Sequence, residues 1–332
     1  VLKAASATPL TAMRILELFY EEAGFPKGVV NLVTCSRKES ELLLTDPRIK
    51  AVTFVGSTDV GKHIYSVAAA HGKRVQAQCE AKNHALVLDD CDLESTVNAI
   101  VNSTYGCAGM RCMALPAICV QETIADEFVK LLKEKARKMV VGCAYHPGTK
   151  LGPLVTLEHK RFVCDWIQKG VDEGAELVLD GRDIVVPGYE GGFFVGPTIF
   201  DRVTRDMTVG DREIFGPVTV IKRVKTFEEG LEIMNASPFA NGSVIFTQNG
   251  YYARQFELLS DGGMVGINVG IPVPSAYFPF SGNKDSFFGD QHVLGLDGVR
   301  FYTRAKTVTK HWYDEHSRRR AISTWEGTVE RI

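Results

Sequence analysis

The fold class of this chain is decided by one stretch, Ala51-Val-Thr-Phe-Val-Gly-Ser-Thr-Asp-Val-Gly-Lys62. Its first five residues, Ala51–Val55, are β-branched and apolar and predict a strand, which Gly56-Ser57-Thr58 turns into a helix over Asp59–Ala70. A second strand is predicted over Arg74–Ala77. This strand–helix–strand order predicts an α/β fold with a parallel, doubly wound sheet.

The same alternation continues on both sides of this stretch. Upstream we expect a helix over Thr11–Gly24, a strand over Val29–Val33 and a short helix over Lys38–Leu44. Downstream, alternating strands and helices are predicted over Ala85–Leu88, Leu93–Tyr105, Ala117–Gln121, Ile124–Val140, Val218–Val224, Phe227–Asn235, Ser243–Phe246 and Tyr251–Leu259. A loop rich in Pro and Phe follows over Gly266–Gly289, then a strand over Val299–Thr309 and a polar tail over Glu315–Ile332.

Composition excludes several classes of function. The 332 residues are 45% hydrophobic and 23% charged, which suits a globular chain of about two domains. A net charge of −2 provides no basic field for nucleic acid or an anionic membrane, and no apolar run approaches the ~20 residues of a membrane span. The eight cysteines show neither CxxC pairs nor zinc spacing, so we expect reduced thiols and no metal.

Among the cysteines, Cys112 has the context of a nucleophile. It lies in Tyr105-Gly-Cys-Ala-Gly-Met-Arg-Cys112, a glycine-rich turn after a predicted helix, directly after Arg111. An adjacent cation and helical N–H groups should lower the thiol pKa. A buried structural cysteine is the usual alternative, and Cys107 is the rival nucleophile.

Two further motifs are ambiguous by themselves. Gly56-Ser57-Thr58 at a strand-to-helix turn could let a phosphate approach the helix N-terminus, although capping is the commoner reason for such residues. Glu213, in Asp-Arg-Glu-Ile-Phe-Gly-Pro217, would normally be a solvated turn residue. Its apolar neighbours suggest partial burial, which a carboxylate tolerates only with partners such as hydroxyls.

Taken in order, the motifs resemble the aldehyde dehydrogenase superfamily over nearly the whole chain. The matching segments are Val1-Leu-Lys3, Gly28-Val-Val-Asn31, Phe54-Val-Gly-Ser-Thr58, Gly109-Met-Arg-Cys112, Leu151-Gly-Pro153, Gly196-Pro-Thr198 and Glu213-Ile-Phe-Gly-Pro217. The resemblance implies a doubly wound cofactor domain, an α/β catalytic domain and a small oligomerisation arm. It places these at 1–78 (the C-terminal part of the NAD-binding domain), 79–290, and 291–332 (oligomerisation strand and tail).

Other segments are similar to the CoA-acylating malonate- and methylmalonate-semialdehyde dehydrogenases. They are Lys73-Arg-Val-Gln-Ala77, Ala81-Lys-Asn-His84, Arg111-Cys-Met-Ala-Leu115, Ile271-Pro-Val-Pro274, Phe278-Pro-Phe280 and Ser286-Phe-Phe-Gly-Asp290. Most aldehyde dehydrogenases have a Glu, the base that activates hydrolytic water, where this chain has Gln78, and an amide cannot take that proton. The substitution favours the CoA thiol over water. Glu80, where the family has Gly, is open as a displaced base facing the site.

The resemblance implies a reaction and its residues. The Cys112 thiolate attacks the aldehyde, hydride passes to NAD, and CoA takes the thioester with loss of CO₂, giving propionyl-CoA or acetyl-CoA. The main-chain N–H of Cys112 forms half of an oxyanion hole. Arg111 clamps the substrate carboxylate, or only tunes the thiol and packs the loop.

The cofactor residues are implied in the same way. Lys3 matches the contact to the adenosine ribose, Ser57 the contact to the pyrophosphate, and Glu213 the contact to the nicotinamide ribose. Ser6 replaces a family Glu, so NAD is expected with NADP possible and weaker discrimination between them. The full implied set is Lys3, Ser6, Gly56, Ser57, Cys79, Glu213 and Phe215.

Family members extend further at the N-terminus, where the first cofactor-domain strands, an oxyanion Asn and a second substrate Arg are found. We therefore expect that this chain lacks part of the family pattern. A homodimer or homotetramer is expected, in a bacterial cytoplasm or a mitochondrial matrix. Two alternatives stay open: a hydrolytic dehydrogenase with Glu80 as base, and an inactive truncated homologue acting in binding or assembly.

Overall fold

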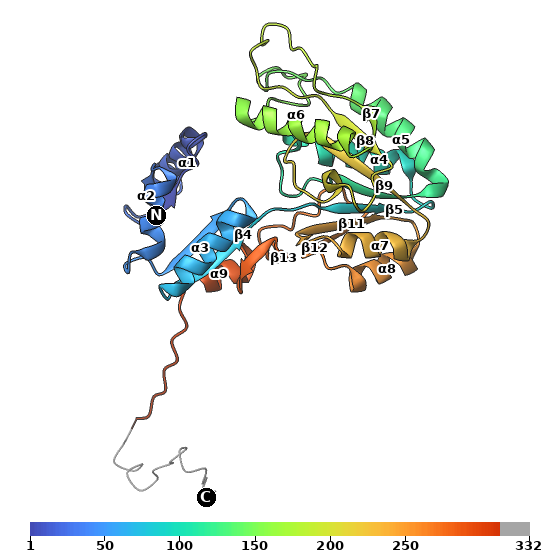
Figure 1. The fold of residues 1–332 in the computed structure, drawn as a ribbon. Helices are drawn as coiled ribbons and strands as arrows, with labels where there is room; N and C mark the ends of the chain where they lie inside the picture. Colours follow the sequence, from blue (N-terminus) through green and yellow to red (C-terminus); the bar gives the residue numbers. More distant parts are fainter. Residues whose placement is uncertain (313–332) are drawn as a thin grey trace, which may run out of the picture.

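The computed structural model describes residues 1–312, and a seven-stranded sheet forms the middle layer of its larger part, on the right in Figure 1. The strand order is β12-β11-β5-β6-β9-β8-β7, and every pairing is parallel except that of β7 with β8. The strands are β5 (His84–Val87), β6 (Ala117–Gln121), β7 (Glu176–Leu179), β8 (Thr198–Asp201), β9 (Val218–Val224), β11 (Gly242–Phe246) and β12 (Met264–Ile267).

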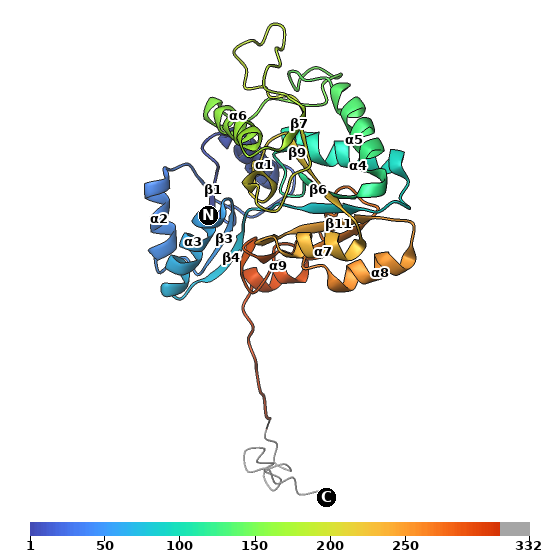
Figure 2. The same ribbon diagram turned by 45° about the vertical axis from the view of Figure 1, so that its right-hand side comes forward.

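Helices cover both faces of this sheet, as a doubly wound fold requires (Figures 1 and 2). Successive residues of β5 show why: Ala85 and Val87 pack into one core cluster, Leu86 and Leu88 into the other. Strands buried on both faces read as continuous apolar runs. One face carries α4 (Leu93–Tyr105), α5 (Glu122–Arg137) and α6 (Leu157–Asp172), and the other α7 (Phe227–Asn235) and α8 (Gly250–Leu259).

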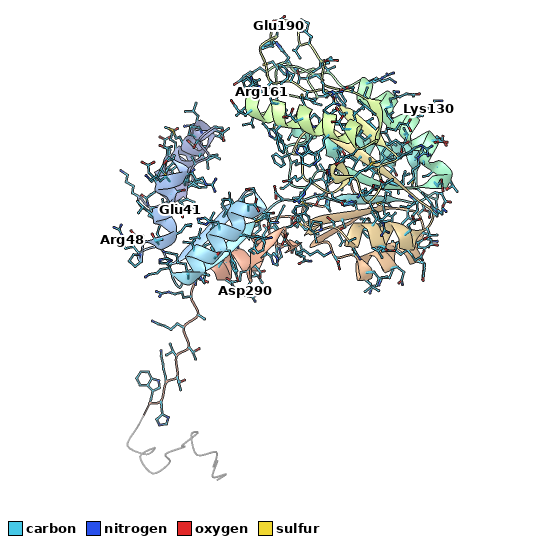
Figure 3. The ribbon with its side chains drawn as sticks, viewed as in Figure 1. Glu41, Arg48, Lys130, Arg161, Glu190 and Asp290 are labelled. Atoms are coloured by element: carbon cyan, nitrogen blue, oxygen red, sulfur yellow. The ribbon has the colours of Figure 1, made fainter. Side chains whose placement is uncertain are left out.

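Charged side chains lie on the outer faces of α5 and α6. Lys130 on α5 and Arg161 on α6 are exposed and point away from the sheet (Figure 3). The opposite stripe of α5 is fully buried, through Phe128 and Leu132. This division is the amphipathic pattern that predicted the helix.

A second, three-stranded sheet contains the stretch that predicted the fold. It has the order β14-β4-β3, with β3 (Ala51–Val55) parallel to β4 (Arg74–Gln78) and β14 (Phe287–Gly289) antiparallel to β4. The helix α3 (Thr58–Ala70) packs on this sheet. Because β4 continues into β5 through residues 79–83 alone, this connector links the two sheets and brings their ends together.

The N-terminal residues form a smaller unit with α1 (Pro9–Glu21), α2 (Arg37–Thr45), β1 (Leu2–Lys3) and β2 (Leu32–Val33). The two strands pair in parallel. The strand predicted from Val29 begins only at Leu32, because Gly28 adopts φ +88° and its carbonyl accepts from the Asn31 side chain, which keeps the chain in a turn. No residue of α1 is buried.

The prediction of a strand over Val299–Thr309 is wrong. Residues Gly295–Tyr302 form the helix α9, and no strand follows within the described residues to 312. Only Phe301 of this segment is buried, under the Arg74 guanidinium, so the alternation does not reflect a half-buried strand. The predicted tail over Glu315–Ile332 lies outside the described residues.

The long loop before α9 is broken by two short strands, β14 and β13 (Asn283–Lys284), the latter paired with β10 (Phe239–Ala240). Across residues 1–312 no helix is long and apolar enough to cross a membrane. The same residues hold no cluster of side chains that could ligate a metal.

Candidate active site

The loop that carries Cys112 has an unusual backbone. After α4, a short 3₁₀ turn over Gly106–Gly109 contains Cys107 at φ +53° and Ala108 at φ +54°, in the left-handed region that L-residues rarely adopt. Gly109 follows at φ +72°, and a Cβ there would lie 2.1 Å from the carbonyl oxygen of Gly216. The Cys112 loop is therefore packed, backbone against backbone, on the loop after Glu213.

Two asparagines hold the Cys112 peptide. The Asn83 amide nitrogen donates to the carbonyls of Cys112 and Ala114, both at 2.8 Å, and the Asn241 amide nitrogen donates to the Cys112 carbonyl at 3.0 Å. Asn83 comes from the connector between β4 and β5, and Asn241 lies directly before β11. Because Asn83 also directly precedes β5, the neighbour of β11, two adjacent strands of the seven-stranded sheet orient the residue predicted as nucleophile.

The pKa of the Cys112 thiol is raised rather than lowered, which corrects the prediction from the sequence. Burial of the half-buried side chain is the main cause, and the Glu213 carboxylate adds to it. The amides of Cys112 and Met113 and the charge of Arg111 act in the predicted direction but are outweighed. The surroundings of Cys112 in this structure therefore disfavour its thiolate form.

Arg111 turns toward the rival cysteine. Its Nη2 donates to the Sγ of the exposed Cys107 at 3.2 Å. The guanidinium also lies against Gly106, where a Cβ would meet Nη2 at 2.8 Å. Its role as a substrate clamp stays a prediction, since within residues 1–312 its side chain is hydrogen-bonded to this weak thiol acceptor alone.

Glu213 is hydrogen-bonded to the connector between the sheets. Its carboxylate accepts from the Ala81 amide at 3.1 Å, so a backbone N–H takes the place of the expected hydroxyl partners. Burial raises the pKa of Glu213 to about 7, and the charge of Glu80 adds to the rise, while the Ala81 N–H and Lys82 oppose it. Phe215 adopts φ +54°, and its carbonyl accepts from His159 Nε2 at 2.8 Å.

One pocket gathers several predicted residues, including Arg111, Cys112, Glu213 and Phe215. Its lining is Ala81, Asn83, Thr104, Gly109, Arg111, Cys112, Ala114, Pro116, Glu213, Ile214, Phe215, Gly216 and Val218. The motifs that seemed ambiguous by themselves are therefore neighbours in space.

Gln78 and Glu80 point to different places, although the sequence predicted that they share a face. Gln78 is buried, and its amide nitrogen donates to the Asn241 oxygen at 2.7 Å. The Glu80 carboxylate instead accepts from the Thr58 amide at 3.3 Å, at the start of α3. The strand β4 ends at Gln78, so the alternation of strand faces does not extend to Glu80.

The remaining cofactor candidates lie at the start of α3 and beside it. Ser57 is the N-cap residue, and its side chain makes no capping hydrogen bond. Gly56 packs under the Phe54 ring, where a Cβ would be 2.5 Å away. Cys79 lies beneath α3, and burial raises its pKa to about 12, which makes its thiol inert.

Lys3 and Ser6 lie in the N-terminal unit, at and after β1. Lys3 is partly buried and its ammonium group donates to the Ala4 carbonyl at 3.1 Å, while Ser6 is exposed. Within residues 1–312, neither side chain forms a hydrogen bond with a residue that lines the Cys112 pocket. Their cofactor role stays a prediction.

Sequence reasoning missed Asn83, Lys82 and Asn241. The first two fall within Ala81-Lys-Asn-His84, a segment that carried the resemblance without a role for its residues. Their side chains contact residues about 30 to 130 positions away, which the local pattern of charge and hydropathy does not encode.

Comparison with known proteins agrees with this geometry. The model of the family described as "Aldehyde dehydrogenase family" matches residues 1–308. The chain is 49% identical over 313 residues to malonate-semialdehyde dehydrogenase 1 of Oceanobacillus iheyensis, and 48% identical to malonate-semialdehyde dehydrogenase of Bacillus cytotoxicus. Each match covers 94% of this chain and 64% of the relative, so the chain spans slightly less than two thirds of their length.

Solved structures give the same result. The methylmalonate-semialdehyde dehydrogenase of Oceanimonas doudoroffii superposes with TM-score 0.93 at 42% identity, over 96% of this chain and 65% of that chain. An aldehyde dehydrogenase of Mycobacterium tuberculosis complexed with NAD⁺ superposes with TM-score 0.84 at 32% identity, over 90% and 60%. The fold and family expected from the ordered motifs are confirmed, and the chain belongs to the aldehyde dehydrogenase family.

Proposed function

We propose that the protein oxidises malonate or methylmalonate semialdehyde with NAD and transfers the acyl group from Cys112 to coenzyme A, with loss of CO₂. The observation that carries this proposal is the surroundings of Gln78. Its amide, and not a carboxylate, contacts Asn241, which in turn holds the Cys112 carbonyl at 3.0 Å. Because an amide does not accept a proton at neutral pH, no base is placed there to activate water.

In this proposal the acyl group is carried covalently by Cys112. Sγ would bond to the aldehyde carbon as the thiol proton passes to the carbonyl oxygen. When that carbon gives up a hydride, for which NAD would supply the acceptor, the same proton would leave to solvent. The thioester that remains is attacked by the CoA thiol, which regenerates Cys112. Loss of the substrate carboxylate as CO₂, with a proton from solvent taking its place on the carbon, leaves acetyl-CoA or propionyl-CoA.

Three features of the chain fit the cofactor. The turn between β3 and α3 presents a helix N-terminus whose N-cap Ser57 makes no capping bond, which suits a phosphate group. Glu213 is hydrogen-bonded to the connector between the sheets, and within residues 1–312 its carboxylate accepts from one N–H donor, so acceptor sites remain for ribose hydroxyls. Gly56 lets the turn pack against the Phe54 ring directly before Ser57.

Arg111 suits the carboxylate of a semialdehyde substrate. Its guanidinium lies at the pocket that Cys112 also lines, and it donates a hydrogen bond to the Cys107 Sγ. A carboxylate is a much stronger acceptor than a thiol, so substrate would displace this contact. The hydrolytic alternative is not favoured, since Glu80 is hydrogen-bonded at the start of α3.

The boundaries of the domains and the homo-oligomeric state are parts of the same proposal. The boundary near residue 78 coincides with the end of β4, where the chain passes from the three-stranded to the seven-stranded sheet.

The proposal is tested by measuring NADH formation from each semialdehyde with and without CoA. We expect turnover that depends on CoA, with acetyl-CoA or propionyl-CoA as product. Equal rates without CoA would overturn the acylating assignment, and no NADH under any condition would overturn the activity of this chain.

A further inference from the structure

Lys82 is a fully buried lysine that contacts no carboxylate directly. Its side chain is 2% exposed, and its ammonium group donates to the carbonyls of Val209 at 3.0 Å and Arg212 at 2.8 Å. Burying a lysine is costly unless its N–H groups are satisfied. Here the N–H groups of Lys82 donate to carbonyls at the two ends of one short turn, Val209–Arg212.

This turn carries Glu213 into the Cys112 pocket. The 3₁₀ turn η2 (Thr208–Gly210) precedes Glu213, and the residues that follow, Ile214–Val218, form one wall of the pocket. The same wall touches the Cys112 loop at Gly109. Movement of the turn would therefore displace both Glu213 and the surface that buries the thiol.

Neighbouring groups hold the same segment from the same side. The Ala81 amide, one residue before Lys82, donates to the Glu213 carboxylate. Lys222, itself buried, makes an ion pair with Asp211 at 2.9 Å. The His84 ring lies in the same cluster and contacts the Lys82 carbonyl and Lys222. Burial lowers the pKa of His84 well below its usual value, which disfavours the protonated ring.

We infer that Lys82 is a positioning residue, which ties the turn Val209–Arg212 to the connector between the sheets and thereby sets both the orientation of Glu213 and the burial of Cys112. The effect on Glu213 as a cofactor contact rests on the proposed function. The effect on Cys112 does not, because it follows from the protein contacts alone.

Lys73 provides a matched control. It is also buried, at 6% exposed, and its ammonium group also donates to two carbonyls of one turn, those of Asp46 and of Ile49, the latter at 2.7 Å. That turn carries no candidate site residue. The substitutions K82M and K73M each keep an apolar stem and remove the same kind of contact.

The test measures the rate of Cys112 alkylation by iodoacetamide between pH 6 and 10, and NAD affinity by calorimetry, on the full chain. For K82M we expect alkylation at pH 7.5 to rise roughly threefold or more, since Glu213 and the burying wall no longer hold the thiol neutral, and NAD affinity to fall about tenfold. K73M should lower the thermal midpoint similarly while leaving both readouts unchanged. K82R, which restores a donor, should recover part of both.

If K82M matches K73M, with lower stability but unchanged alkylation and affinity, Lys82 is structural only and the inference is wrong. Should K82M not fold, K82Q, which has a shorter side chain without a charge, is measured in the same way and read by the same criteria. If no variant and no wild-type protein binds NAD, the proposed cofactor fails, while the alkylation profile still decides the role of Lys82.

Discussion

At the scale of single residues, the two cysteines of the active loop have different surroundings. Cys112 is half-buried, and its carbonyl accepts hydrogen bonds from Asn83 and Asn241. Cys107 is exposed in a left-handed turn and accepts a hydrogen bond from Arg111. Fixed geometry, rather than a lowered pKa, distinguishes Cys112. An orienting network of this kind places a nucleophile without needing it to be ionised in advance.

This difference predicts opposite results for two similar substitutions. C112S should reduce NADH formation by at least about 10³-fold, because the oxygen is a far weaker nucleophile. C107S should keep activity within about threefold, since it removes only a weak acceptor for Arg111. The measurement is NADH formation under saturating substrates. Full loss in C107S with activity in C112S would reverse the assignment.

Glu213 should control how readily Cys112 ionises. Its carboxylate raises the pKa of the Cys112 thiol, so E213Q, which removes the charge and keeps the acceptor for the Ala81 amide, should lower that pKa. The profile of iodoacetamide alkylation against pH should then move to lower pH. D206N, which neutralises an exposed carboxylate on a neighbouring turn, is the control and should leave the profile in place.

Glu80 predicts a change in cofactor affinity. Its carboxylate accepts a hydrogen bond from the Thr58 amide at the start of α3, beside the proposed phosphate contact Ser57. A cofactor phosphate bound there would be repelled by this carboxylate. E80G should tighten NAD binding about tenfold. D285N, which neutralises another carboxylate at this end of α3, paired with Lys62, should change affinity little. Unchanged or weaker binding by E80G would show that Glu80 does not compete.

At the scale of elements, the sequence predicted the strands and helices that bury apolar side chains periodically. The helices α4 and α7 and the strands β6 and β9 begin and end where the pattern indicated. The failures share a cause. In α9 one buried residue, Phe301, anchors the segment, so hydropathy alternation carries little information there. Short strands such as β13 exist only through pairing with distant residues, which periodicity does not detect.

The Cys112 loop contacts the loop after Glu213 at Gly109 and Gly216, so a single methyl group added at Gly109 should have a large effect. G109A would place Cβ 2.1 Å from the Gly216 carbonyl at φ +72°, so it should destabilise the protein by about 3 kcal/mol and, by pushing this wall off the Cys112 loop, raise the rate of Cys112 alkylation. G24A has a similar φ of +66° with nothing within 4 Å, and should cost only about 1 kcal/mol. Urea unfolding and alkylation measure both. Equal losses would show that the loop contact is not tight.

At the scale of the whole molecule, the candidate site is assembled from segments that lie far apart in the sequence. Cys112, Glu213 and Gln78 were identified from their motifs, but Asn83, Asn241 and Lys82 were not, because amides and a lysine that serve backbone carbonyls leave no pattern in the sequence. The carbonyls that these side chains contact become their neighbours only once the chain has passed from β4 in one sheet to β5 in the other. Placement of Lys3 and Ser6 likewise depends on how the N-terminal unit contacts a cofactor.

Global stability should depend on pH through Glu213. Its pKa is about 7 in the fold against 4.5 in the unfolded chain, so the folded state binds the proton more tightly. The resulting stability is fully present below about pH 4.5 and is lost as the pH rises to about 7. E213Q, which does not titrate, should therefore gain on the order of 2 kcal/mol relative to wild type between pH 5 and 8. A constant difference in the free energy of unfolding across that range would contradict this.

The central claim is that the acyl group waits on Cys112 for CoA because no base activates water. The most direct measurement is a single turnover with semialdehyde and NAD but without CoA, quenched and analysed by mass spectrometry of the peptide containing Cys112. We predict an acyl adduct on Cys112 that persists until CoA is added and then appears as acyl-CoA. Rapid release of free acid without CoA, with no adduct on Cys112, would contradict the account.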